Sequence, residues 1–206
     1  MENIQWVFFD IGSTLASEEK AYLHRLRDMT EKKGVSVKEY FAVRDAFDRQ
    51  GLDGDAEAIR RFQLTKTTWP SEDEFPFEDC EETLKTLCER GYKLGIIANQ
   101  NPGAKERLKA WDIEKYFSVI ASSAELGFSK PDPRIFEKAL EMAGCRAENA
   151  VMIGDRPDND IAPANKLKMV TIRMKQGRSA LKEPKEETEM ADQTVESLHE
   201  ILNILL

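Results

Sequence analysis

Side chains capable of chemistry stand at the end of the first apolar run in this 206-residue sequence. Residues 4–9 lead directly into Asp10, and the segment "WVFFDIGSTL" then turns through Gly12, Ser13 and Thr14. A carboxylate at the end of a buried strand costs free energy unless it is paired, hydrogen-bonded or bound to a metal ion. The position of Asp10 therefore indicates a chemical role.

Comparable side chains follow later apolar runs. Asn99 and Gln100 come after residues 94–98, Asp155 and Asp160 come after residues 151–153, and Lys130 stands before a helix in "FSKPDP". Ligands of open parallel sheets bind beyond the carboxyl ends of the strands, so we expect these groups to gather at one rim. Carboxylates, a lysine and amide groups together suit a hard divalent cation and an anionic substrate.

The elements that must position these residues follow from hydrophobic periodicity. Short runs typical of buried strands cover residues 4–9, 94–98, 119–121, 151–153 and 170–172. Helical segments separate most of them, one opened by an expected capping box of Asp79 and Glu82, another running from Pro133 to a stop at Gly144. This alternation predicts an α/β fold, a doubly wound and mostly parallel sheet with helices on both faces.

Two regions break the alternation. Residues 16–77 contain no good strand and carry charged segments of helical period, so we expect a small α-helical cap domain there. Residues 1–15 and 78–206 would then form the core domain. Residues 175–193 are polar and charged, which predicts an exposed loop before a last helix from about Thr194.

Composition limits the functional class. Lys and Arg total 30 against 38 for Asp and Glu, and this net charge of -8 disfavours nucleic acid or an anionic membrane as a partner. Three cysteines without paired-ligand spacing fit reduced thiols and argue against structural zinc. No signal sequence or membrane-spanning run is evident, so we expect a cytoplasmic protein, either monomer or homodimer.

Four segments taken together resemble the haloacid dehalogenase (HAD) superfamily. They are "FFDIGSTL", "LGIIANQ", "FSKPDP" and "VMIGDRPDND", in this order over nearly the whole chain. Each is weak alone, but the combination is highly specific. The resemblance implies a HAD-like Rossmannoid core, an α-helical cap inserted after the first strand, and covalent catalysis through an aspartate.

Carried over residue by residue, the resemblance implies a role for each motif position. Asp10 would be the nucleophile that attacks phosphorus. Mg²⁺ would be bound by Asp10, the backbone carbonyl of Gly12, and Asp155. Lys130 would offset negative charge, and Asp160, favoured over the closely spaced Asp158, would orient Lys130 or metal-bound water. The substrate-binding residues would be Ser13, Thr14, Asn99 and Gln100, with backbone N–H groups of the turn at residues 12–14 completing an anion cradle.

Two positions depart from the family pattern. Gly12 stands where HAD phosphatases carry a second Asp as general acid/base, a group worth ~10²–10⁴-fold in rate. Ala98 replaces a usual Ser or Thr in the second motif. The metal site survives, because a glycine still offers its carbonyl.

The favoured interpretation is a Mg²⁺-dependent hydrolase, a phosphatase of a small phosphorylated metabolite. It would act on good leaving groups or borrow an acid from the cap or the substrate. One alternative is a catalytically weak or inactive module that binds a phospho-ligand or a protein. A haloacid dehalogenase is disfavoured, because that branch places an aromatic residue where Gly12 stands, and the metal carboxylates are retained.

Overall fold

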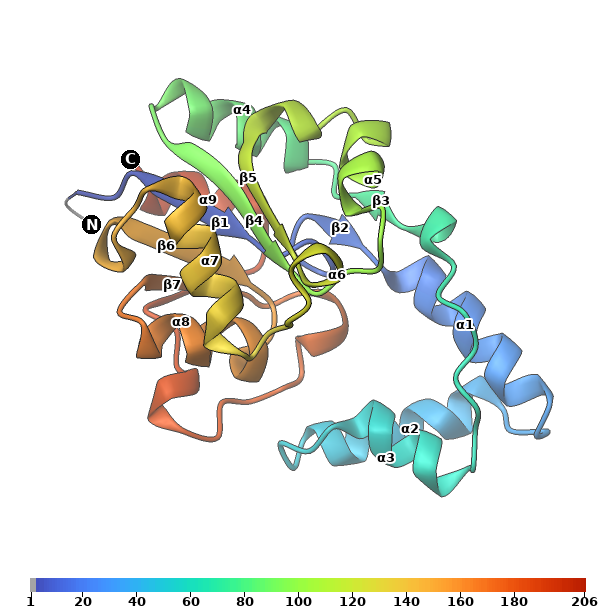
Figure 1. The fold of residues 1–206 in the computed structure, drawn as a ribbon. Coiled ribbons are helices and arrows are strands. Elements are labelled where there is room, and N and C mark those ends of the chain that lie inside the picture. The colour runs from blue at the N-terminus through green and yellow to red at the C-terminus, as the bar shows by residue number, and fades with distance from the viewer. Residues whose placement is uncertain (1–2) are drawn as a thin grey trace.

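The computed structural model describes residues 3–206, with the exception of the Arg178 side chain, and its centre is a six-stranded parallel sheet (Figure 1). The strand order is β5-β4-β1-β6-β7-β8. Their bounds are β1 (Trp6–Phe9), β4 (Lys93–Ala98), β5 (Phe117–Ser122), β6 (Ala150–Gly154), β7 (Val170–Met174) and β8 (Gln193–Val195). The predicted doubly wound, mostly parallel α/β fold is confirmed.

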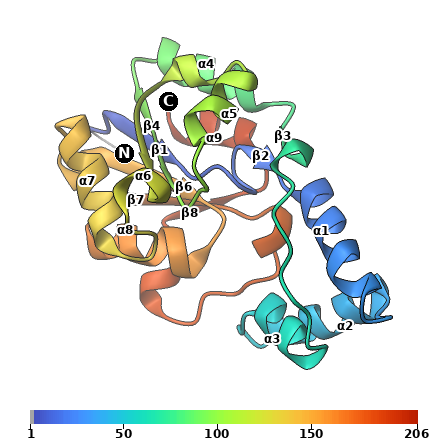
Figure 2. The same ribbon diagram turned by 45° about the vertical axis from the view of Figure 1, so that its right-hand side comes forward.

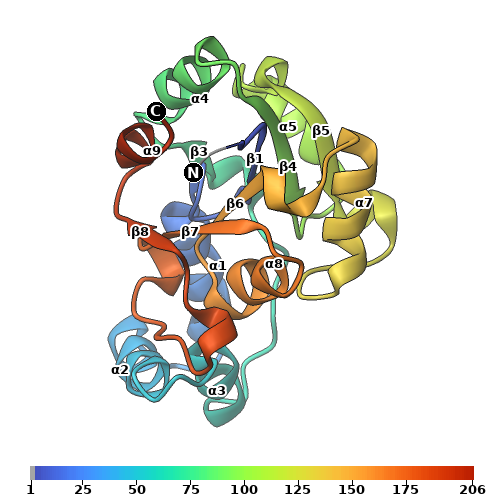
Figure 3. The same ribbon diagram turned by 90° about the vertical axis from the view of Figure 1, so that its left-hand side faces the viewer.

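Helices cover both faces of the sheet (Figure 3). One face packs against α4 (Cys80–Glu89), α5 (Ala104–Ala110) and α9 (Leu198–Ile204), and the other against α7 (Pro133–Ala143) and α8 (Ala162–Lys166). In β1, Val7 and Phe9 belong to the first core, while Trp6 and Phe8 belong to the second. Burial on both sides explains why the strand sequences are continuously apolar.

The parallel register brings the strand ends together. Phe9 of β1 lies opposite Ile96 of β4 and Ile153 of β6. Asp10 continues this pairing, because its backbone N–H donates to the carbonyl of Ile153 at 2.9 Å. The residues that follow β1, β4 and β6 therefore share one rim, as the sequence predicted.

Three helices between β1 and β4 form a separate cluster. They are α1 (Glu19–Glu31), α2 (Val37–Asp48) and α3 (Gly54–Arg61), and Figures 1 and 2 show them extending away from the sheet. Their apolar faces, including Tyr22, Leu26 and Tyr40, pack on one another. The cap boundaries at residues 16 and 77 stay a prediction.

A short ribbon that the sequence analysis did not anticipate joins the two parts. Strands β2 (Ala16–Ser17) and β3 (Phe75–Pro76) pair antiparallel where the chain leaves and re-enters the core. Two residues are too few for a periodic signal, so this pairing is set by tertiary contact.

Near the C-terminus the loop prediction was partly wrong. Gln193–Val195 forms the edge strand β8, the last helix begins at Leu198 rather than near Thr194, and Ser179 is buried. The remaining helix, α6 (Ser123–Leu126), is a single turn that follows β5.

The expected capping box of α4 was also wrong. Asp79 lies at the N-cap position of α4, but its side chain makes no capping hydrogen bond there. Its carboxylate instead accepts a hydrogen bond of 3.0 Å from the backbone N–H of His199, in the first turn of α9. The same carboxylate thus satisfies an orphan N–H of another helix, which only the tertiary arrangement makes available.

Candidate active site

A buried lysine joins two carboxylates at the rim of the sheet. Lys130 Nζ lies 2.7 Å from Asp10 Oδ1 and 2.6 Å from Asp160 Oδ1. All three side chains are buried. Although burial disfavours the ammonium, the two carboxylates raise the pKa of Lys130 above its ordinary value. This lysine is therefore positively charged and fixed beside Asp10 at neutral pH.

Asn99, which follows β4, positions the backbone of Lys130. Its Nδ2 donates to the Lys130 carbonyl at 2.9 Å, and its Oδ1 accepts from the Lys130 N–H at 2.7 Å. Two hydrogen bonds to one residue fix the loop before α7 against the end of β4. The Asn99 amide thus contributes to the site by fixing the position of Lys130.

Asp160 is held by its backbone surroundings. Its Oδ2 accepts a hydrogen bond of 2.9 Å from the N–H of Arg156, across a π-helical turn at Pro157–Ile161. A Cβ on Gly154 would lie only 2.4–2.5 Å from Asp160 side-chain atoms. The glycine at the end of β6 therefore gives Asp160 the space to reach Lys130.

Three buried acids form a compact oxygen cluster. Oxygen atoms of Asp10, Asp155 and Asp160 all lie within 4.8 Å of one another. Burial raises the pKa of Asp10 to about 6, although Lys130 acts in the opposite direction. Burial and the charges of Asp160 and Asp10 raise the pKa of Asp155 well above its usual range. An all-oxygen donor set with excess negative charge fits a hard divalent cation such as Mg²⁺.

The turn after β1 differs in part from the expected anion cradle. The Ser13 N–H donates to the Ala16 carbonyl at 2.8 Å, and the Thr14 N–H to the Ile11 carbonyl at 3.3 Å. These two N–H groups have partners within the turn, and their binding of phosphate stays a prediction. The Ser13 hydroxyl donates to Glu18 Oε2 at 3.2 Å.

Thr14, the next residue of this turn, was also expected to bind substrate. Its side chain is fully buried, and its hydroxyl has no hydrogen-bond partner. Its expected contact with a substrate stays a prediction. The turn directs this side chain inward, which spacing along the chain does not reveal.

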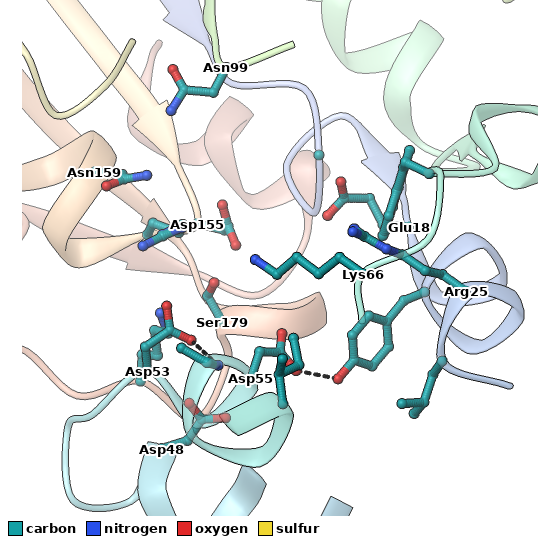
Figure 4. Close-up of a pocket in the computed structure, with 18 of the residues that line it drawn as sticks. Glu18, Arg25, Asp48, Asp53, Asp55, Lys66, Asn99, Asp155, Asn159 and Ser179 are labelled. Atoms are coloured by element: carbon teal, nitrogen blue, oxygen red, sulfur yellow. Dashed lines mark hydrogen bonds between the residues drawn. The ribbon is translucent and has the colours of Figure 1, made fainter. Parts of the chain in front are cut away.

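A cavity of about 320 Å³ lies between the rim and the helices α1–α3 (Figure 4). Asp10, Gly12, Asn99, Gln100, Lys130, Asp155 and Asp160 line its rim side. The opposite side includes Tyr22, Arg25 and Lys66. Figure 4 shows the Arg25 and Lys66 side chains on this side of the pocket. The cavity thus joins the acidic cluster to a wall that carries two cations.

Comparison with known proteins supplies the family. Residues 7–174 match the haloacid dehalogenase-like hydrolases. The chain belongs to this family. A glyceraldehyde 3-phosphate phosphatase from Methanopyrus kandleri is 30% identical to this HAD hydrolase over 194 residues, covering 92% of the chain and 80% of the relative.

Two solved structures resemble the whole HAD hydrolase. A HAD phosphatase from Thermococcus onnurineus has a TM-score of 0.68 at 25% identity, with 98% of each chain covered. A protein described as a predicted phosphoglycolate phosphatase from Haemophilus somnus has a TM-score of 0.75 at 17% identity over 100% of both chains, and this likeness concerns the fold alone.

Within residues 3–206, no helix combines the length and apolarity needed to cross a bilayer.

Several pocket residues of this HAD hydrolase were not singled out from the sequence. Glu18, Arg25, Lys66 and Ser179 line the cavity, but each stands in a charged or polar segment without a motif. Arg60, another charged side chain of the same region, pairs with Glu57 and does not line the cavity. Long charged side chains on helices give no local signal of direction, so only the fold separates these cases.

Proposed function

We propose that this HAD hydrolase is a Mg²⁺-dependent phosphatase that acts on a small phosphorylated metabolite through an aspartyl-phosphate on Asp10. The observation that carries the proposal is the contact of Asp10 with Lys130 inside the three-carboxylate cluster. The names of its relatives, including the Methanopyrus kandleri phosphatase, support hydrolysis of a phosphate ester.

In the proposed reaction each rim residue has a separate task. Asp10 attacks phosphorus, and the Lys130 ammonium orients this carboxylate while stabilising the negative charge of the phosphoryl group. Asp160 holds Lys130 in place through its 2.6 Å contact. Bound between Asp10, the Gly12 carbonyl and Asp155, Mg²⁺ would supply positive charge that offsets the carboxylates and the phosphate.

Substrate contacts come from both sides of the cavity in this proposal. Gln100 lies at the rim, where its backbone N–H donates to Ser123 Oγ at 3.0 Å. Arg25 and Lys66 provide cations for the remaining charge of a phosphorylated compound. Residues 16–77 would act as a cap that excludes water and selects the substrate.

The test compares phosphate release and phosphoenzyme formation. Acetyl phosphate, p-nitrophenyl phosphate and glyceraldehyde 3-phosphate are supplied with Mg²⁺ or with EDTA to the wild type, Asp10→Asn and a control, Asp112→Asn. Asp112 is exposed and pairs with Lys115, so its variant should keep full activity. We expect Asp10→Asn and EDTA each to abolish turnover and acid-stable phosphate labelling. Undiminished turnover by Asp10→Asn would refute the covalent mechanism.

Gly12 supports a second candidate, a phospho-ligand or protein binding module with little turnover. Such a module would be stabilised against thermal unfolding by a phosphorylated compound without releasing inorganic phosphate. Release of halide from a haloacid without added metal would instead support a dehalogenase. Thermal stabilisation, phosphate release and halide release, all measured on the same purified protein, distinguish the three functions.

A further inference from the structure

We propose that Glu18 is the general acid/base of this enzyme and performs the task left open by Gly12. The inference rests on the proposed phosphatase function. A Cβ built on Gly12 would lie 2.5 Å from Glu18 Oε1, 2.6 Å from its carboxyl carbon and 2.9 Å from Oε2. Glu18 Oε1 lies about as far from this Cβ as an aspartate's own carboxylate oxygens would. The carboxyl group of Glu18 therefore occupies the space that an aspartate at position 12 would use.

The local structure directs Glu18 to this place. Glu18 precedes α1 at the N-cap position, but its side chain makes no capping hydrogen bond there. It turns back toward the β1 turn, where Ser13 Oγ donates to Oε2 at 3.2 Å. Figure 4 shows Glu18 and Asp155 on different sides of the same pocket. The carboxylate of Glu18 is thus presented to the cavity rather than used at the N-terminus of α1.

Glu18 lies beside the acidic cluster without belonging to it. Among the described residues, the acids whose ligand atoms lie within 4.8 Å of one another are Asp10, Asp155 and Asp160. Glu18 is outside this group, although it lines the cavity together with Asp10 and Lys130. Its position suits proton transfer to a leaving group better than it suits binding of the shared cation.

The proposed proton transfers balance over two steps. As Asp10 bonds to phosphorus, the bond between phosphorus and the leaving oxygen breaks, and protonated Glu18 gives its proton to that oxygen to release an alcohol. The Glu18 carboxylate then takes a proton from water. The remaining hydroxide bonds to phosphorus, the bond to Asp10 breaks, and inorganic phosphate leaves with Asp10 and Glu18 restored.

The experiment measures phosphorylation and dephosphorylation separately in Glu18→Gln. A good leaving group needs no proton in the first step, whereas an alkoxide does. We expect kcat/KM for glycerol 3-phosphate to fall by ~10²–10⁴-fold and that for p-nitrophenyl phosphate or acetyl phosphate by less than about tenfold. Because the second step needs the base for every substrate, p-nitrophenolate should appear in a burst of about one equivalent per enzyme. Glu19→Gln, the exposed neighbour, is the matched control and should behave as the wild type.

A pair of variants tests the shared space directly. Gly12→Asp in a Glu18→Gly background should restore alkyl phosphate hydrolysis by roughly tenfold or more over Glu18→Gly alone, since the carboxylate returns to the same place. In the metal-free protein, Gly12→Asp should lower the unfolding temperature more when Glu18 is present than when it is Gly, because the two carboxyl groups then compete for one site.

The outcomes separate this inference from the proposed function. Equal losses for alkyl, aryl and acyl phosphates without a burst would overturn the role of Glu18 alone. So would recovery of Glu18→Gln activity at high Mg²⁺ concentration, which would make Glu18 part of the metal site. Additive effects of Gly12→Asp and Glu18→Gly on the unfolding temperature would overturn the shared position. Failure of the wild type to form a phosphoenzyme or to turn over any substrate would overturn the proposed function, and this inference with it.

Discussion

Replacement of Lys130 by Met tests whether the ammonium holds the acidic cluster together. Met preserves the unbranched apolar stem of the side chain but removes the contacts of 2.7 and 2.6 Å to Asp10 and Asp160. Removing one partner from a buried ion pair costs about 3–5 kcal/mol, because the remaining charge stays buried without compensation. We therefore expect Lys130→Met to lower the free energy of unfolding by about 3–5 kcal/mol at pH 8 in EDTA.

The destabilisation caused by Lys130→Met should depend on pH in a defined direction. The folded pKa of Asp10 is about 6 in the wild type against an ordinary 3.8, so the folded state binds this proton more tightly than the unfolded state does. As pH rises from well below 4 to well above 6, the unfolding free energy of the wild type should consequently fall by about 3 kcal/mol from this group. Without Lys130 the acids protonate more readily, so the destabilisation caused by Lys130→Met should be smaller at pH 5 than at pH 8.

Urea denaturation followed by circular dichroism measures these differences. Lys138→Met is the control, because the Lys138 side chain is 41% exposed and pairs with Glu141 at the surface, where a change within about 0.5 kcal/mol is expected. A destabilisation by Lys130→Met below about 1 kcal/mol at pH 8 would contradict the reasoning. A cost of equal size at pH 5 and pH 8 would show that the lost packing, rather than the lost charge, is responsible.

Two further predictions concern the metal and the glycine behind Asp160. Mg²⁺ at 100 times its Kd should raise the free energy of unfolding of the wild type by about 2.7 kcal/mol, as measured by calorimetry. Asp155→Asn should lose this gain, while the control Asp112→Asn keeps it. An undiminished gain in Asp155→Asn would place the cation elsewhere. Gly154→Ala should cost about 1–3 kcal/mol in urea denaturation, because the new Cβ would lie 2.4–2.5 Å from Asp160 atoms. Unchanged stability of Gly154→Ala would mean that Asp160 moves away freely.

The sequence alone determined the fold class and which residues meet at the rim of the sheet. The apolar runs that became β1, β4, β5, β6 and β7 were all identified, and Pro133 and Gly144 marked the limits of α7. These features depend on neighbouring residues, through periodicity, a fixed proline φ and a glycine with positive φ. Parallel strands place their ends at one rim whatever the details of packing, so the gathering of Asp10, Lys130 and Asp160 followed from topology.

Tertiary structure decided which side chains reach that rim and which do not. Thr14 turns inward beside Asp10, Asp79 caps α9 instead of α4, and Glu18 reaches the space next to Gly12. In each case local sequence allows several directions for a short polar or long charged side chain. The direction of each side chain depends on distant elements, whose relative placement is fixed only when the helices have packed against the sheet. Such contacts leave no period or motif along the chain, so the sequence does not reveal them.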